Sequence, residues 1–221
     1  MRLGRISLSI GMVFLAFLTL GFVAHATLLG WSGLTRDLSG VSRLWSDIAA
    51  ANTGVFAHMI AGAVITLLAP LQLIPGLRAK LPAVHRASGR VIVLLALIAA
   101  LGGLTYIALN GTIGGPHMSI AFAVYGGLMA VTALQAIRYA RARNFDLHQE
   151  WALRLFFLAI GSWLYRVHYG LWDLATGGAG MQPDFRGPFD QVNLWAFYVP
   201  YLAALEWALW RQGRGLIGAR R

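Results

Sequence analysis

The chain has 221 residues, of which 58% are hydrophobic and only 12% are charged, and it contains no cysteine. Apolar runs near the roughly 20 residues that cross a bilayer as a helix exclude an ordinary soluble domain. The lack of cysteine excludes disulfides, thiolate metal sites and covalent haem attachment through a Cys-x-x-Cys-His motif.

Six apolar segments follow one another along the chain, and each predicts a transmembrane helix. They cover approximately residues 6–30, 52–75, 91–109, 117–138, 151–173 and 191–211. Short loops join them, so we expect one all-α transmembrane domain over residues 1–221, a bundle of six helices.

The first segment has features of a signal peptide. It follows Arg2 and Arg5 and contains the triplet Ala24-His25-Ala26, which resembles a cleavage site. Its apolar stretch of about 19 residues is longer than the usual 7–15 of a signal sequence. We therefore expect an uncleaved helix.

The net charge of +10 is distributed asymmetrically. Three basic residues, Arg36, Arg43 and Arg186, lie in loops on one predicted side, and Arg166 lies within a segment. The other 14 of the 18 lie at segment ends that six crossings bring to the opposite side. This bias predicts the bacterial cytoplasmic (inner) membrane with both termini in the cytoplasm. The partner it indicates is the lipid bilayer, not nucleic acid.

The second and third segments form a predicted hairpin that the fourth and fifth repeat. The first hairpin runs from His58 through a basic loop to His85, and the second runs from His117 to His148. Two such hairpins predict a pseudo-repeated four-helix core flanked by the first and last segments.

These four histidines alternate between the two predicted sides of the membrane. Facing imidazoles at equal depth in a helix bundle can hold a haem iron from both sides. We therefore predict a bis-histidine haem b protein for transmembrane electron transfer, with His58 and His117 as one ligand pair and His85 and His148 as the other. The sequence does not identify a redox partner, an enzymatic activity or an oligomeric state.

Two motifs carry a family resemblance. His85-x-x-x-Gly89-Arg90 and His148-x-x-Trp151-x-x-Arg154 resemble those of a bacterial membrane family catalogued as domain of unknown function 2306, over roughly residues 55–175. Ala152 stands where methionine is expected more often. The resemblance implies a polytopic membrane protein without a settled activity.

The order of the histidines also resembles that of the ascorbate-reducible transmembrane b-type cytochromes. In those proteins, helices two and four share one haem and helices three and five share the other. The resemblance is architectural, and it implies the same two histidine pairs.

Arginines supply candidate contacts for the cofactor or for lipid. Arg86, Arg90 and Arg154 accompany the two motifs, and they suit a haem or, alternatively, anionic lipid headgroups. Arg166 lies within the fifth segment and requires an anion, for which Asp173, Asp184, Asp190, a haem propionate or a lipid phosphate are candidates. Arg154 and Glu206 lie at nearly the same predicted depth, so we expect an ion pair between them.

Two other functions compete with haem binding. His25, His58, His117 and His168 all map to the outer half of the segments and could form a zinc, copper or iron site. The third hypothesis is a small transporter or lipid-interacting bundle, with Pro70 and Pro200 as kinks and paired glycines as packing points.

Overall fold

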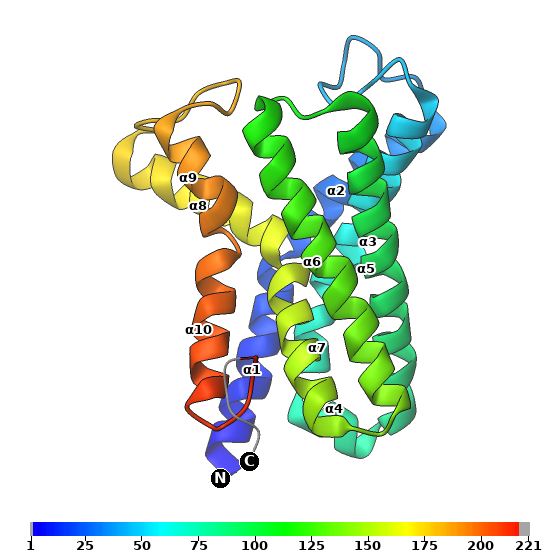
Figure 1. Ribbon diagram of the computed structural model, residues 1–221, viewed down its shortest axis with the longest axis vertical. Coiled ribbons are helices and arrows are strands. Elements are labelled where there is room, and N and C mark those ends of the chain that lie inside the picture. Colours follow the sequence, from blue (N-terminus) through cyan, green and yellow to red (C-terminus); the bar gives the residue numbers. More distant parts are fainter. Residues whose placement is uncertain (1, 217–221) are drawn as a thin grey trace. The chain divides into compact units, whose positions relative to one another are not determined.

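The computed structural model describes residues 2–216, with side chains from Ser7 onward, and all regular secondary structure in this range is helical. The all-α prediction is confirmed. The helices, labelled in Figure 1, are α1 (Arg2–Leu18), α2 (Leu20–Thr35), α3 (Ala49–Gln72), α4 (Pro75–Lys80), α5 (Pro82–Asn110), α6 (Gly115–Arg141), α7 (Phe145–Ala159), α8 (Gly161–Thr176), α9 (Pro188–Ala196) and α10 (Val199–Trp210). They form two compact units, Met1–Asn110 and Gly111–Arg221.

Three helices, α3, α5 and α6, are long and apolar enough to cross a membrane, and α1 with α2 makes a fourth if the bent pair is one span. These helices match the first four predicted segments. The fifth and sixth segments are each divided, into α7 with α8 and α9 with α10. These four helices have only 9 to 16 residues each, fewer than the roughly 20 that cross a bilayer.

One predicted boundary was wrong. Helix α5 begins at Pro82, not near residue 91, so His85, Arg86 and Arg90 lie on its first turns instead of in a loop. Proline favours the first turn of a helix because its fixed φ suits that position and its missing N–H has no partner to lose there.

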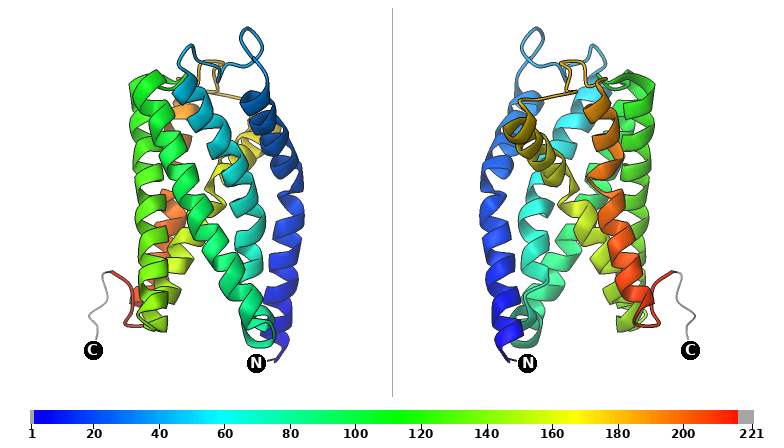
Figure 2. Two further views of the ribbon diagram at one scale, coloured as in Figure 1. Left: turned by 90° about the vertical axis from the view of Figure 1, so that its right-hand side faces the viewer. Right: turned by 90° about the vertical axis from the view of Figure 1, so that its left-hand side faces the viewer.

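The first segment is bent instead of continuous. Helices α1 and α2 meet at Thr19 with an angle of 40° between them, seen in Figure 2 as the bend in the blue helix. The buried Thr19 hydroxyl donates to the Ala16 carbonyl (2.7 Å). A threonine that bonds back to its own helix in this way commonly accompanies a bend.

The segment between α2 and α3, residues 36–48, is irregular. Within it the Ser39 N–H donates to the Asp37 carboxylate (2.7 Å), and this bond lowers the pKa of the exposed Asp37 carboxyl.

Glycines allow the helices of the first unit to approach closely. Helices α3 and α5 run side by side (Figure 1). A Cβ on Gly54 would lie 2.7 Å from the Gly102 carbonyl oxygen, and a Cβ on Gly102 would lie 2.4 Å from the Gly54 oxygen. On α2, a Cβ on Gly33 would lie 2.3 Å from the Phe56 ring of α3. The backbones therefore pack where side chains are absent.

The second unit contains an antiparallel hairpin of α6 and α7 with a break after α7. The turn places Arg143 at φ 58°, and the Asn144 side chain caps α7 by accepting from the Leu147 N–H (3.2 Å). Helix α8 then turns away from the axis of α7 (Figures 1 and 2).

A tyrosine from α6 explains the break between α7 and α8. The Tyr125 hydroxyl donates to the Leu158 carbonyl, which would otherwise serve the helical ladder. A Cβ on Gly161 would lie 2.9 Å from that hydroxyl, so the glycine makes room for it. A side chain inserted into the backbone ladder is a recognised cause of helix kinks.

Candidate functional site

His58 lies on α3 in a slot formed by glycines of α5. Its Nδ1 lies 2.6 Å from the Ala99 carbonyl oxygen. A Cβ on Gly103 would lie 3.0 Å from the same Nδ1, so the glycine leaves space for the ring. Because a carbonyl can only accept, Nδ1 carries a proton, and in the neutral ring the lone pair is then on Nε2. This is the tautomer of a histidine that ligates a metal through Nε2.

His148 uses the same arrangement in the second unit. It lies on α7, and its Nδ1 donates to the Ala136 carbonyl of α6 (2.9 Å). The lone pair is therefore on Nε2 here as well. In each hairpin, one histidine is oriented by a backbone carbonyl of the adjacent helix.

His117 has protein partners at both ring nitrogens. Nδ1 bonds to Gln191 Oε1, and Nε2 accepts from the Trp195 indole N–H (3.0 Å). The side chain is exposed at the start of α6. In this conformation its lone pair faces a tryptophan, so ligation by His117 would require Trp195 to move.

His168 on α8 is also bonded at both nitrogens. Nδ1 lies 2.8 Å from Asn193 Oδ1, and Nε2 lies 2.8 Å from the Tyr201 hydroxyl. The Asn193 amide nitrogen donates to the Tyr165 carbonyl (3.3 Å), which turns its oxygen toward His168. Nδ1 of His168 therefore donates, and Nε2 accepts from Tyr201.

The remaining histidines lie on two helices of the first unit. His25 is exposed on α2, and His85 is half-buried in the first turns of α5. Among the described residues, no group of three or more histidine, aspartate or glutamate side chains is arranged to hold a metal ion. The alternative metal site of four histidines draws on both units and stays a prediction.

The arginines fall into two classes. Arg86 and Arg90 are exposed on α5, and Arg166 is exposed on α8. Nη1 of Arg166 donates to the Ser162 carbonyl of its own helix (2.9 Å). Among its expected carboxylate partners, Asp184 lies near Arg186 (3.8 Å) and Asp190 accepts from Tyr169 (2.7 Å). A carboxylate partner for Arg166 stays a prediction.

The ion pair between Arg154 and Glu206 is confirmed. Arg154 Nε lies 2.5 Å from Glu206 Oε1, and the Arg154 side chain is only 4% exposed. Its guanidinium carbon lies 4.7 Å from the centre of the Trp151 ring. Nη1 and Nη2 are buried without a hydrogen bond, so the Glu206 carboxylate balances the charge of the guanidinium and the Trp151 face adds a cation–π contact.

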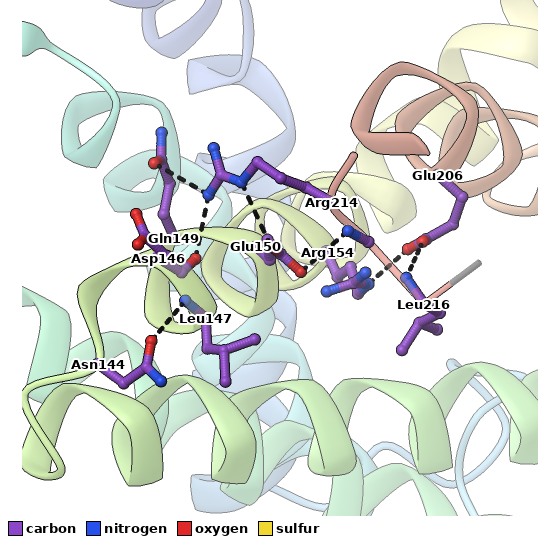
Figure 3. A network of polar contacts seen from close by, with 10 residues as sticks. Asn144, Asp146, Leu147, Gln149, Glu150, Arg154, Glu206, Arg214 and Leu216 are labelled. Carbon is purple, nitrogen blue, oxygen red and sulfur yellow. Dashed lines mark hydrogen bonds and ion pairs between the residues drawn. The ribbon is translucent and has the colours of Figure 1, made fainter. Parts of the chain in front are cut away.

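A second ion pair joins the same network, shown in Figure 3, and was not predicted. Arg214 Nε lies 3.3 Å from Glu150 Oε1, and the Gly215 N–H donates to Glu150 Oε2 (3.3 Å). The Leu216 N–H donates to Glu206 Oε2 (3.0 Å). Each carboxylate thus receives one arginine and one backbone donor. The signal in the sequence is the position of Arg214 between two glycines. In the structure, Gly213 and Gly215 both have positive φ.

A groove opens beside His168 in the second unit. Its volume is about 310 Å³, and it is open along one side. Trp172 and Phe189 stack on each other there with ring centres 4.8 Å apart and planes at 14°. The lining residues are His168, Leu171, Trp172, Phe189, Val192, Asn193 and Ala196. Sequence reasoning singled out His168 alone among them.

Comparison with known proteins gives a family. A family model described as "Predicted membrane protein (DUF2306)" matches residues 55–205, which reaches farther than the stretch predicted from the two motifs. No curated protein and no solved structure matched the chain. The likeness to b-type cytochromes stays an architectural prediction. The match includes both histidine motifs and more than half of the chain, which therefore belongs to the DUF2306 family of predicted membrane proteins.

Proposed function

We propose that this protein is a b-type haem protein of the bacterial cytoplasmic membrane that transfers electrons. One observation carries the proposal: His58 and His148 each donate Nδ1–H to a carbonyl of the adjacent helix, at 2.6 and 2.9 Å. Such a bond orients the ring, fixes the proton on Nδ1 and makes Nε2 a better ligand. A histidine that only anchored the chain at a lipid interface would not need its tautomer fixed.

Each unit then contributes one oriented imidazole for iron, and haem b supplies a one-electron redox centre when bound. The role of this chain is to hold the two rings. Gly103 leaves space for His58, and the α6–α7 hairpin holds His148 against Ala136. His117 and His85 are the second ligands by the alternation in the sequence, and ligation by His117 requires Trp195 to release its Nε2.

A visible spectrum tests the proposal. The protein is expressed with a haem precursor, purified, and measured as a reduced-minus-oxidised difference. We expect b-type bands, with loss of about half the bound haem in His58→Leu and in His148→Leu, because each removes one oriented ligand. His25→Leu is the matched control, since His25 is exposed. A well-folded protein without Soret absorption, or equal haem content in all variants, would overturn the proposal.

The proposed topology has six spans with both termini in the cytoplasm, and it can be tested separately. The chain has no cysteine, so single cysteines can be introduced without a background signal. We expect Ser39→Cys and Gln182→Cys to react with a membrane-impermeant maleimide in intact cells. Ala142→Cys and Gln212→Cys should react only after lysis. Labelling of all four in intact cells would contradict this orientation.

A further inference from the structure

We propose that the groove beside His168 binds the headgroup of an isoprenoid quinone. This inference rests on the proposed electron-transfer function and names the class of its lipid-soluble redox partner. It concerns residues of the second unit only, namely α8, α9 and the hydroxyl of Tyr201 on α10.

The groove combines an aromatic wall with a polar floor. Trp172 and Phe189 are nearly parallel, so they present a flat surface on which a planar ring can stack. His168 and Asn193 are the polar lining residues, whereas Leu171, Val192 and Ala196 are aliphatic. A mostly apolar site with a few placed polar groups is the usual composition of a small-molecule site.

The polar residues are held in one orientation by a chain of hydrogen bonds. Tyr201 donates to His168 Nε2, His168 Nδ1 donates to Asn193 Oδ1, and the Asn193 amide donates to the Tyr165 carbonyl. An amide nitrogen carries two N–H bonds, so Asn193 retains a second donor beyond the one given to Tyr165. A quinone carbonyl is a suitable acceptor for it.

The chemistry of the groove distinguishes a quinone from other occupants. A phospholipid acyl chain offers no acceptor to the remaining amide donor of Asn193. A charged, water-soluble reductant gains nothing from the aliphatic and aromatic wall. A quinone has a flat ring, carbonyl acceptors and an isoprenoid tail. The tail can leave along the open side, past the exposed Leu171 and Val192.

Quinone titration of the full-length protein in lipid nanodiscs tests the inference. The probe is decylubiquinone, and the signal is quenching of tryptophan fluorescence. We expect a saturable component in the wild-type protein. Val192→Phe fills the groove from an exposed position and should weaken the apparent affinity by about tenfold. Leu174→Phe is the matched control, because Leu174 is 86% exposed on α8, the helix that carries His168 and Trp172, and does not line the groove.

A second variant tests the location of the signal. Trp172→Phe keeps an aromatic wall but removes the nearest fluorophore, so the saturable quenching should fall while quinone still binds, as measured by co-purification. Quenching that rises linearly with quinone, or that is identical in Val192→Phe and the wild-type protein, would overturn the inference. Co-purification of phospholipid instead of quinone would also overturn the inference, if Val192→Phe displaces that phospholipid.

Haem and quinone are read by different signals, so the two proposals can fail separately. The titration is therefore run on haem-supplied and haem-free preparations. Haem bands without saturable quinone binding would support the electron-transfer function and refute quinone as its partner. Saturable quinone binding in a protein that never shows haem bands would support the groove and refute the haem function.

Discussion

The α3–α5 pair of the first unit and the α6–α7–α8 region of the second unit are both built on an antiparallel helical hairpin, but different chemistry holds them together. In the first, Gly54 and Gly102 bring two backbones into contact. In the second, Tyr125, Arg154 and Glu206 join helices through hydrogen bonds and an ion pair. Small residues and polar bonds are two solutions to packing apolar helices in lipid, where burial of apolar surface contributes little.

The two units should therefore lose stability for opposite reasons. The first unit has little room at its helix contacts, so added volume should damage it. The second unit depends on particular polar atoms, so their removal should damage it at constant volume. Substitutions of each kind, made in both units, test this distinction.

The largest expected effect is on the buried ion pair. Arg154→Leu leaves the half-buried Glu206 carboxylate without its guanidinium, which should reduce the free energy of unfolding by about 3 kcal/mol, the lower end of the range for a buried pair. Denaturant unfolding in lipid nanodiscs measures the change. Arg154→Leu/Glu206→Leu should recover most of the loss, because no unpaired charge remains.

The exposed pair of Arg186 and Asp184 supplies the control for this experiment. Its side chains are 59% and 53% exposed, so Arg186→Leu should change the free energy of unfolding by less than about 1 kcal/mol. A double variant at Arg154 and Glu206 that is no more stable than the single variant would show that packing, not charge, holds this part of the second unit.

Added volume in the first unit comes next. Gly33→Ala places a methyl group 2.3 Å from the Phe56 ring, so the free energy of unfolding should fall by about 1–3 kcal/mol. Gly62→Ala on α3 is the matched control, because no atom lies within 4 Å of its added Cβ. That variant should gain up to about 1 kcal/mol from helix propensity. Equal losses in both variants would refute close packing as the cause.

The smallest effect expected is the removal of one hydroxyl. Tyr125→Phe keeps the ring but leaves the Leu158 carbonyl without its tyrosine donor, which should reduce the free energy of unfolding by about 1 kcal/mol. Tyr106→Phe is the equivalent change in the first unit, where the hydroxyl accepts from Asn110 (2.9 Å) near the end of α5. It should matter less, and a larger effect there would contradict the distinction between the units.

The features that the sequence predicted correctly depend on local pattern or on depth along a helix. Hydrophobic segments predicted the helices, and equal depth predicted the pairing of Arg154 with Glu206. The break at Ile160 could not be predicted from its own segment, because its cause is Tyr125 on another helix.

The same reasoning explains what was missed at the candidate site. The partners of His117 are Gln191 and Trp195, more than 70 positions away, and the partner of Glu150 is Arg214. Side-chain contacts between distant segments leave no periodic signal. A histidine in an apolar segment can therefore be recognised as unusual, whereas the atom that fixes its tautomer cannot be identified from sequence alone.

The glycine contact between α3 and α5 has a practical consequence for solubilisation. Backbone atoms meet there directly, with Gly54 and Gly102 each facing the other's carbonyl, and no side chain lies between them. A detergent micelle competes for apolar side-chain surface, of which this contact presents none, and weak Cα–H···O bonds gain strength where water is excluded. This hairpin should therefore survive extraction in detergents that loosen helices held by larger side chains.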